Sequence, residues 1–226
     1  TSNPAGGSTS CQAPPATSCT ITGLTNGTSY TFTVTATNRA GTSAASAASN
    51  SVTPKATQTI SFANPGAQNF GTSPTLTATS DSGLTPTFSS STTGICTITS
   101  GGLLTFVTTG SCTINADQAG NDSYLPALQV SRSFTVNPVT PGRPTAVSAT
   151  AGNGSASVSF TAPSSTGGSP ITSYSVTSNP AGGSASCQAP PATSCTVTGL
   201  TNGTSYTFTV TATNSAGTSA ASAASN

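Results

Sequence analysis

The chain has 226 residues but only seven charged side chains, four from Lys and Arg and three from Asp, and it contains no His, Glu, Trp or Met. Most catalytic mechanisms use a titratable side chain. A chain this poor in acids, bases and metal ligands is therefore expected to be neither an enzyme nor a cofactor-binding protein. Four scattered cations cannot form the basic patch that nucleic acid requires. No apolar run approaches the ~20 residues of a membrane-spanning helix.

Hydroxyl-bearing residues take the place of charged ones: 47 residues are Thr and 39 are Ser. Apolar residues alternate with Thr or Ser over residues 205–213, and the same nine residues occur at 29–37. Strict alternation predicts a half-buried strand, and the branched Cβ of Thr suits a pleated sheet. A disordered chain combines few large apolar residues with a high net charge. Large apolar residues are few here, but the net charge is only +1. We therefore predict a folded all-β protein whose polar faces carry Thr and Ser.

The largest signal is an internal repeat. Residues 1–50 match residues 177–226 at an offset of 176, and the only differences are Thr9/Ala185, Ile21/Val197 and Arg39/Ser215. Such near-identity indicates recent duplication in a tandem array. We expect the chain to be a window of a longer protein that repeats a 176-residue unit of two modules. The first fifty residues would then hold half a module. A neighbouring copy could complete it, as in donor-strand assembly, but truncation is the simpler interpretation.

Pro-rich joints at residues 53–56 and 137–144 divide the chain, and such joints act as stiff spacers. We predict three modules: 1–53, the C-terminal part of a module; 54–140; and 141–226, a complete module. In the complete module, turn residues separate seven expected strands, at 146–151, 155–161, 171–178, 184–187, 194–198, 205–213 and 218–223. Seven short strands at this spacing are typical of an antiparallel β-sandwich. The expected architecture is a string of such sandwiches.

Three stretches of the complete module, Pro144–Val147, Val158–Pro163 and Leu200–Val210, resemble the fibronectin type III domain. The resemblance covers 141–226 fully and 1–53 in part. It implies that Tyr206 and Tyr30 make the corner contact found at the start of the family's strand F. It also implies that Phe160 is the core aromatic of strand B, where the family usually has Trp. These features are specific for the fold and say little about a ligand.

The middle segment is similar to the immunoglobulin-like repeats of large bacterial surface proteins. The stretches that carry this resemblance are Gln58–Phe62, Ser82–Phe88, Gly110–Ile114, Gln118–Asn121 and Ser133–Val136. Apolar residues two positions apart also predict strands, at Ile60/Phe62, Leu76/Ala78, Leu104/Phe106 and Phe134/Val136. These motifs encode turns and core positions, so the resemblance implies a fold and no activity.

Six cysteines fall two to a module: Cys11, Cys19, Cys96, Cys112, Cys187 and Cys195. Of the fifteen possible pairings, pairing within each module is the most economical. Loops of this size stabilise by about 2–3 kcal/mol in the chain-entropy model. Buried free thiols and a zinc site are the alternatives, but zinc lacks both His ligands and the C-x₂-C spacing. Disulfides imply an oxidising, extracytoplasmic compartment.

Other residues have both a functional and a structural interpretation. Asn115, Asp117, Asn121 and Asp122 could supply oxygen ligands to calcium, although a solvated turn explains them and no metal site is expected. Lys55 could form an isopeptide crosslink only if it lay in the core beside an acid, and it is predicted to lie in a linker. Glycosylation sequons begin at Asn26, Asn121, Asn153 and Asn202. Exposed Thr and Ser could carry O-linked glycans.

We therefore expect a non-catalytic structural repeat segment of a large extracellular filament, stalk, sheath or surface protein of bacterial origin. Its partners would be neighbouring copies of itself, because low charge removes repulsion between them; glycans are a second candidate. One alternative is an adhesin or carbohydrate-binding module that uses exposed loops such as 164–169. Another is a spacer in a secreted polysaccharide-degrading enzyme.

Overall fold

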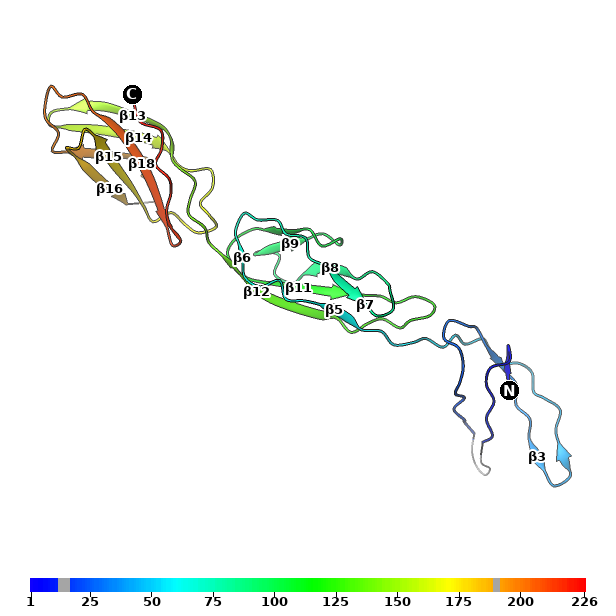
Figure 1. Ribbon diagram of the computed structural model, residues 1–226. Helices are drawn as coiled ribbons and strands as arrows, with labels where there is room; N and C mark the ends of the chain where they lie inside the picture. The colour runs from blue at the N-terminus through cyan, green and yellow to red at the C-terminus, as the bar shows by residue number, and fades with distance from the viewer. Residues whose placement is uncertain (12–16, 189–191) are drawn as a thin grey trace. The chain divides into compact units, whose positions relative to one another are not determined.

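The computed structural model describes residues 1–11, 17–188 and 192–226, and these residues form strands, turns and loops without a helix (Figure 1). The predicted all-β class is therefore confirmed. No helix in this part of the chain could cross a membrane. The chain divides into two compact units. The first comprises Thr1–Ala63, Thr77–Thr87 and Ala116–Val130, and the second comprises Asn64–Leu76, Phe88–Asn115 and Ser131–Asn226.

The first unit contains three antiparallel strand pairs. These pairs are β1 (Ser2–Asn3) with β2 (Thr31–Phe32), β3 (Thr37–Asn38) with β4 (Gly41–Thr42), and β5 (Ile60–Phe62) with β7 (Ala78–Ser80). Gln58, next to β5, is a buried polar residue. Its side chain accepts hydrogen bonds from the hydroxyls of Ser80 and Ser82, and its amide donates to the Leu125 carbonyl at 2.8 Å.

The strands of the middle segment include a four-stranded sheet and a separate hairpin. The sheet has the order β6 (Gln68–Asn69), β12 (Val130–Asn137), β11 (Gly110–Asp117), β8 (Thr87–Ser90), and the hairpin joins β9 (Cys96–Ile98) to β10 (Leu104–Phe106). Strand β11 buries every second residue, at Cys112, Ile114 and Ala116, as alternation predicts. The rings of Phe106 and Phe134 meet edge to face at 6.5 Å, so apolar contacts join the hairpin to the sheet.

The complete module is a sandwich of two antiparallel sheets (Figure 1). One sheet has the order β13 (Thr145–Gly152), β14 (Ser155–Thr161), β17 (Ser194–Thr198); the other has the order β16 (Ser184–Gln188), β15 (Ser173–Asn179), β18 (Thr207–Asn214), β19 (Gly217–Thr218). Valines at alternate strand positions fill the space between the sheets, at Val158, Val176, Val197 and Val210. Phe160 is buried with them and lies 4.7 Å from the ring of Tyr174.

The last expected strand, at residues 218–223, is wrong, because β19 ends at Thr218. Beyond it, every third residue is a Ser that bonds β18 in two ways. The amides of Ser219, Ser222 and Ser225 donate to the carbonyls of Ala212, Val210 and Phe208 at 2.8–2.9 Å. In return, the amides of these β18 residues donate to the serine hydroxyl oxygens at 2.9–3.1 Å. The serine hydroxyl thus takes the place of a main-chain carbonyl.

We call residues 219–226 the serine ladder. Three of its residues span the same length as two residues of β18, which is why a regular strand does not form. Each of the three hydroxyls also donates to the carbonyl of the next residue, at 2.7–2.9 Å. The first copy repeats the pattern, with Ser43, Ser46 and Ser49 accepting from Ala36, Val34 and Phe32 at 3.0–3.1 Å. In both copies, the two-residue alternation of apolar and hydroxyl side chains ends here, and serines recur at every third position instead.

Replacing Ser222 with Ala should destabilise the complete module, because the Val210 amide would lose its acceptor at a buried position. An unsatisfied buried donor costs about 1–3 kcal/mol. Urea unfolding followed by circular dichroism, together with hydrogen exchange at the Val210 amide, measures the effect. The matched control is Ser175→Ala, on the exposed face of β15. Equal stability of the two variants would contradict the role assigned to the Ser222 hydroxyl.

Candidate functional site

Every cysteine is in a disulfide, and each disulfide joins the two cysteines of one predicted module. The pairs are Cys11–Cys19, Cys96–Cys112 and Cys187–Cys195, with Cα–Cα distances of 5.7, 5.8 and 6.0 Å. These distances lie within the range usual for disulfides. The cysteines are therefore crosslinks, and they are not available as metal ligands or nucleophiles.

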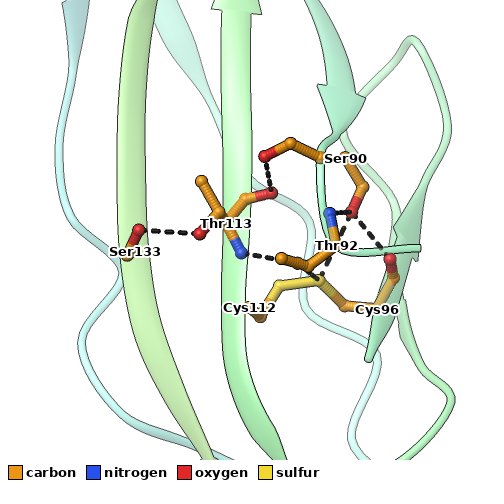
Figure 2. The surroundings of a disulfide bond; sticks show 7 residues. Ser90, Thr92, Cys96, Cys112, Thr113 and Ser133 are labelled. Carbon is orange, nitrogen blue, oxygen red and sulfur yellow. Dashed lines mark hydrogen bonds between the residues drawn. A yellow bond between two sulfur atoms is a disulfide. The ribbon is translucent and has the colours of Figure 1, made fainter. Parts of the chain in front are cut away.

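The Cys96–Cys112 disulfide joins β9 to β11, two strands of different sheets (Figure 2). Both cysteines are fully buried. Hydroxyl groups surround one side of the bond: Ser90 donates to the Cys96 carbonyl at 2.8 Å, and the Thr92 hydroxyl lies 3.4 Å from the Cys96 sulfur. The Thr113 amide donates to the Thr92 hydroxyl at 2.8 Å, which holds that hydroxyl in place. The surroundings are those of a protected structural bond.

The Cys187–Cys195 disulfide performs the same task in the complete module. Cys187 lies on β16 and Cys195 on β17, and these are edge strands of the two different sheets. The bond therefore ties the sandwich together at one side. Residues 189–191 of the enclosed loop, and residues 12–16 of the corresponding loop in the first copy, lie outside the described residues.

The two tyrosines expected at the corner each accept a main-chain hydrogen bond from five residues upstream. The Thr201 amide donates to the Tyr206 hydroxyl at 3.2 Å, and the Thr25 amide donates to the Tyr30 hydroxyl at 3.1 Å. In both tyrosines this amide is the main cause of a lowered pKa, because a donated hydrogen bond favours the phenolate. The contact fixes the turn that leads from β17 to β18, and thus from one sheet to the other.

Tyr174 is a contrasting case. Its ring is buried against Phe160, and burial raises the pKa of its hydroxyl. Among the described residues that hydroxyl has no hydrogen-bond partner. The three tyrosines therefore have structural roles, either as an acceptor at a corner or as part of the core.

Three of the four oxygen-rich residues considered for calcium accept hydrogen bonds from the protein itself, and Asp122 is the exception in the described part of the chain. Asn115 accepts from the Ser131 hydroxyl at 2.7 Å, Asp117 accepts from the Gln129 amide at 2.8 Å, and Asn121 accepts from two main-chain amides at 2.8 and 2.9 Å. Across the described ranges, no three His, Cys, Asp or Glu side chains lie close enough to hold a metal ion. These contacts favour the interpretation as a turn.

Lys55 is exposed, and its ammonium donates to the main-chain carbonyl of Asn121 at 2.6 Å. An isopeptide bond needs a buried lysine beside a carboxylate, which this environment does not provide. Of the sequon residues, Asn153 and Asn202 bond to one another: the Asn202 amide donates to the Asn153 side-chain oxygen at 2.8 Å. Their side chains thus join two turns of the complete module.

The structure also has a pocket that sequence reasoning missed. It has a volume of about 270 Å³ and lies at the end of the complete module where β18 begins. Strand β13, the turn after β17, the start of β18 and the terminal Asn226 contribute its walls, among them Ala149, Ala156, Leu200, Tyr206, Phe208 and Asn226. These residues are far apart in sequence, so only a comparison of the two copies could have pointed to it.

Two sheets in the orders β13-β14-β17 and β16-β15-β18-β19, with a tyrosine corner before β18, define an immunoglobulin-like β-sandwich module. A model of the fibronectin type III domain matches residues 2–52 and 141–226, which together are more than half of the chain. The chain belongs to the fibronectin type III domain family. The match leaves out residues 53–140, for which the immunoglobulin-like assignment stays a prediction.

Solved structures similar to the chain include titin kinase with its flanking domains (32% identity, 39% of this chain, 17% of that chain, TM-score 0.35). They also include consecutive domains from titin (20% identity, 91% and 76%, TM-score 0.39) and the FN1–FN3 domains of chicken CNTN1 (17% identity, 90% and 76%, TM-score 0.35). The chain thus spans about a sixth of the titin kinase structure. No curated protein matches it.

Replacing Tyr206 with Phe should destabilise the complete module by about 1 kcal/mol, the usual net value of a hydrogen bond, because the Thr201 amide loses its acceptor. Tyr174→Phe is the matched control: it removes a hydroxyl of the same kind that has no partner in the described part of the chain. Urea unfolding of both variants measures the difference. If Tyr174→Phe cost as much as Tyr206→Phe, the corner hydrogen bond would not be the cause.

Acid should destabilise the β5–β7 strand pair through Asp81. Its carboxylate accepts the Thr59 amide at 2.9 Å and the Thr59 hydroxyl at 2.8 Å, and the amide is the larger cause of its lowered pKa. A carboxyl with a lowered folded-state pKa stabilises at pH values above its unfolded-state pKa of about 3.9. That stabilisation is lost as the pH falls through the folded-state pKa.

The measurement is the urea midpoint between pH 7 and pH 2, followed in the unmodified chain and in Asp81→Asn. We expect the variant to lose part of the acid dependence at pH values below the unfolded-state pKa of this carboxyl. Asp122→Asn is the control, because its carboxylate has no hydrogen bond among the described residues. An unchanged acid dependence in Asp81→Asn would show that the contact with Thr59 does not stabilise the β5–β7 pair.

Proposed function

We propose that this chain is a non-catalytic structural repeat segment of a large extracellular filament, stalk, sheath or surface protein. The observation that carries the proposal is that two nearly identical copies make the same stabilising contacts. Each copy has a disulfide between cysteines eight residues apart and a tyrosine corner. Each also has serines at every third position that bond to the residues after its corner tyrosine. A sequence duplicated with so few changes suits a protein in which repetition sets length.

The chemistry of the described side chains supports a structural role. The cysteines are oxidised to crosslinks, two tyrosine hydroxyls accept main-chain hydrogen bonds, and Asp81 is bonded to Thr59. These are the side chains that general acid–base or nucleophilic catalysis would need. Their use in stabilising contacts supports a structural role for these side chains.

The disulfides support an extracellular or cell-surface location, because such bonds persist in oxidising compartments. A bacterial origin is supported only by the resemblance of the middle segment to bacterial surface repeats. Neighbouring copies of the chain are the proposed partners. All seven charges lie between Arg39 and Arg143, so residues 144–226 carry no charged side chain that would repel another copy.

Mechanical unfolding of single molecules pulled from their two ends tests the proposal. Each disulfide should shield its loop from extension, so reduction should lengthen the unfolded chain. At about 3.4 Å per residue, the 16-residue separation of Cys96–Cys112 corresponds to about 50 Å and the 8-residue separation of Cys187–Cys195 to about 20 Å, after the native Cα–Cα distance is subtracted. The double variant Cys96→Ser/Cys112→Ser should show the 50 Å step without reductant.

A chain that extends at low force in both redox states would contradict a mechanical role. A glycan array provides the second test. Specific, saturable binding of one glycan class to the chain would favour the adhesin or carbohydrate-binding alternative over a purely structural segment.

A further inference from the structure

In the first copy, a valine pairs with Tyr30, the residue that precedes β2. The Tyr30 amide donates to the Val52 carbonyl at 2.9 Å, and the Val52 amide donates to the Tyr30 carbonyl at 2.8 Å. Ser49 pairs with Phe32 and Val52 pairs with Tyr30, so a step of three residues on one side again matches a step of two on the other. Val52 is therefore a fourth step of the serine pattern, in which a valine pairs through its main chain alone.

The complete module has the first three of these steps. Ser219, Ser222 and Ser225 pair with Ala212, Val210 and Phe208, and the next residue of the edge is Tyr206. In the described part of the chain, neither the amide nor the carbonyl of Tyr206 has a hydrogen-bond partner. The 270 Å³ pocket opens at this point, and Tyr206 itself lines it.

The pocket has a mixed lining, in which polar residues such as Thr201, Asn202 and Thr204 lie beside a smaller apolar surface. Its apolar lining includes Ala149, Ala156, Leu200 and Phe208, and the main chain of Tyr206 supplies a donor and an acceptor. Its volume is below the ~300 Å³ at which typical small-molecule pockets begin. No charged residue lines it. The apolar part of the lining can take one small side chain, and the main chain of Tyr206 can pair with an extended segment as Tyr30 pairs with Val52.

Asn226 already leads into the pocket. Its side-chain oxygen accepts a hydrogen bond from the Ala149 amide at 3.2 Å, which holds the end of the serine ladder against β13. Residues joined directly to Asn226 would therefore start at the pocket mouth, between β13 of one sheet and β18 of the other. A joined segment also has a large advantage in effective concentration over a free peptide.

We propose that this pocket takes an extended Ser-Val-Thr segment joined directly to Asn226, with its Val paired to Tyr206 as Val52 is paired to Tyr30. The Val side chain would lie on the Ala149, Ala156 and Phe208 surface and close the sandwich at this end. The proposal does not depend on the proposed function, since it concerns how one module is completed.

The test compares three proteins: the 226-residue chain, the chain extended by Ser-Val-Thr-Pro, and a control extended by Ser-Ser-Thr-Pro. We expect hydrogen exchange at the Tyr206 amide to slow at least tenfold in the Val extension and the thermal midpoint to rise. The Ser control should show a smaller effect, because it keeps the main-chain bonds and loses the apolar contact. Unchanged exchange at Tyr206 in the Val extension would overturn the proposal.

A second arm adds the free peptide Asn-Ser-Val-Thr-Pro to the unextended chain at millimolar concentration. We expect little protection of Tyr206, because the free peptide lacks the advantage of being joined. If the free peptide protected Tyr206 as well as the extension does, the assignment to a joined segment would be wrong, and the pocket would be a site for a separate chain.

Discussion

A shortage of large apolar side chains is the constraint on which the rest of this structure depends. Only 33 of the 226 residues are Leu, Ile, Val or Phe, and a small module with a small core is only marginally stable. The complete module therefore relies on contacts that join its two sheets directly. The Cys187–Cys195 disulfide ties β16 to β17, and the Tyr206 corner fixes the passage from β17 to β18.

Hydroxyl groups supply much of what charge and apolar bulk supply in other proteins. In the serine ladder, hydroxyl oxygens replace main-chain carbonyls as acceptors for the amides of β18. Beside the buried Cys96–Cys112 disulfide, the Ser90 hydroxyl donates to the Cys96 carbonyl. A hydroxyl can donate and accept at once, so a single Ser bonds both β18 and its own following carbonyl. This explains how a chain with so few charges satisfies its buried polar groups.

The serine ladder also bears on self-association. An exposed regular edge strand is a template for pairing with another chain, and a surface without charge does little to prevent it. The ladder covers the edge of β18 with a segment that has a period of three, which does not match the period of two of an incoming strand.

The sequence by itself determined the all-β class, and it located six of the seven strands of residues 141–226 to within two residues, because the alternation of apolar and hydroxyl side chains is a local property. It also favoured pairing of cysteines close in sequence, because short loops close at little entropic cost. It contains the period of three at Ser219, Ser222 and Ser225, but it could not show that these serines bond β18, since that depends on which strand lies opposite them. The tertiary structure alone shows what the ladder bonds and where the pocket at Tyr206 lies. Both depend on β18 and the end of the chain meeting in space, and the pocket depends on β13 as well.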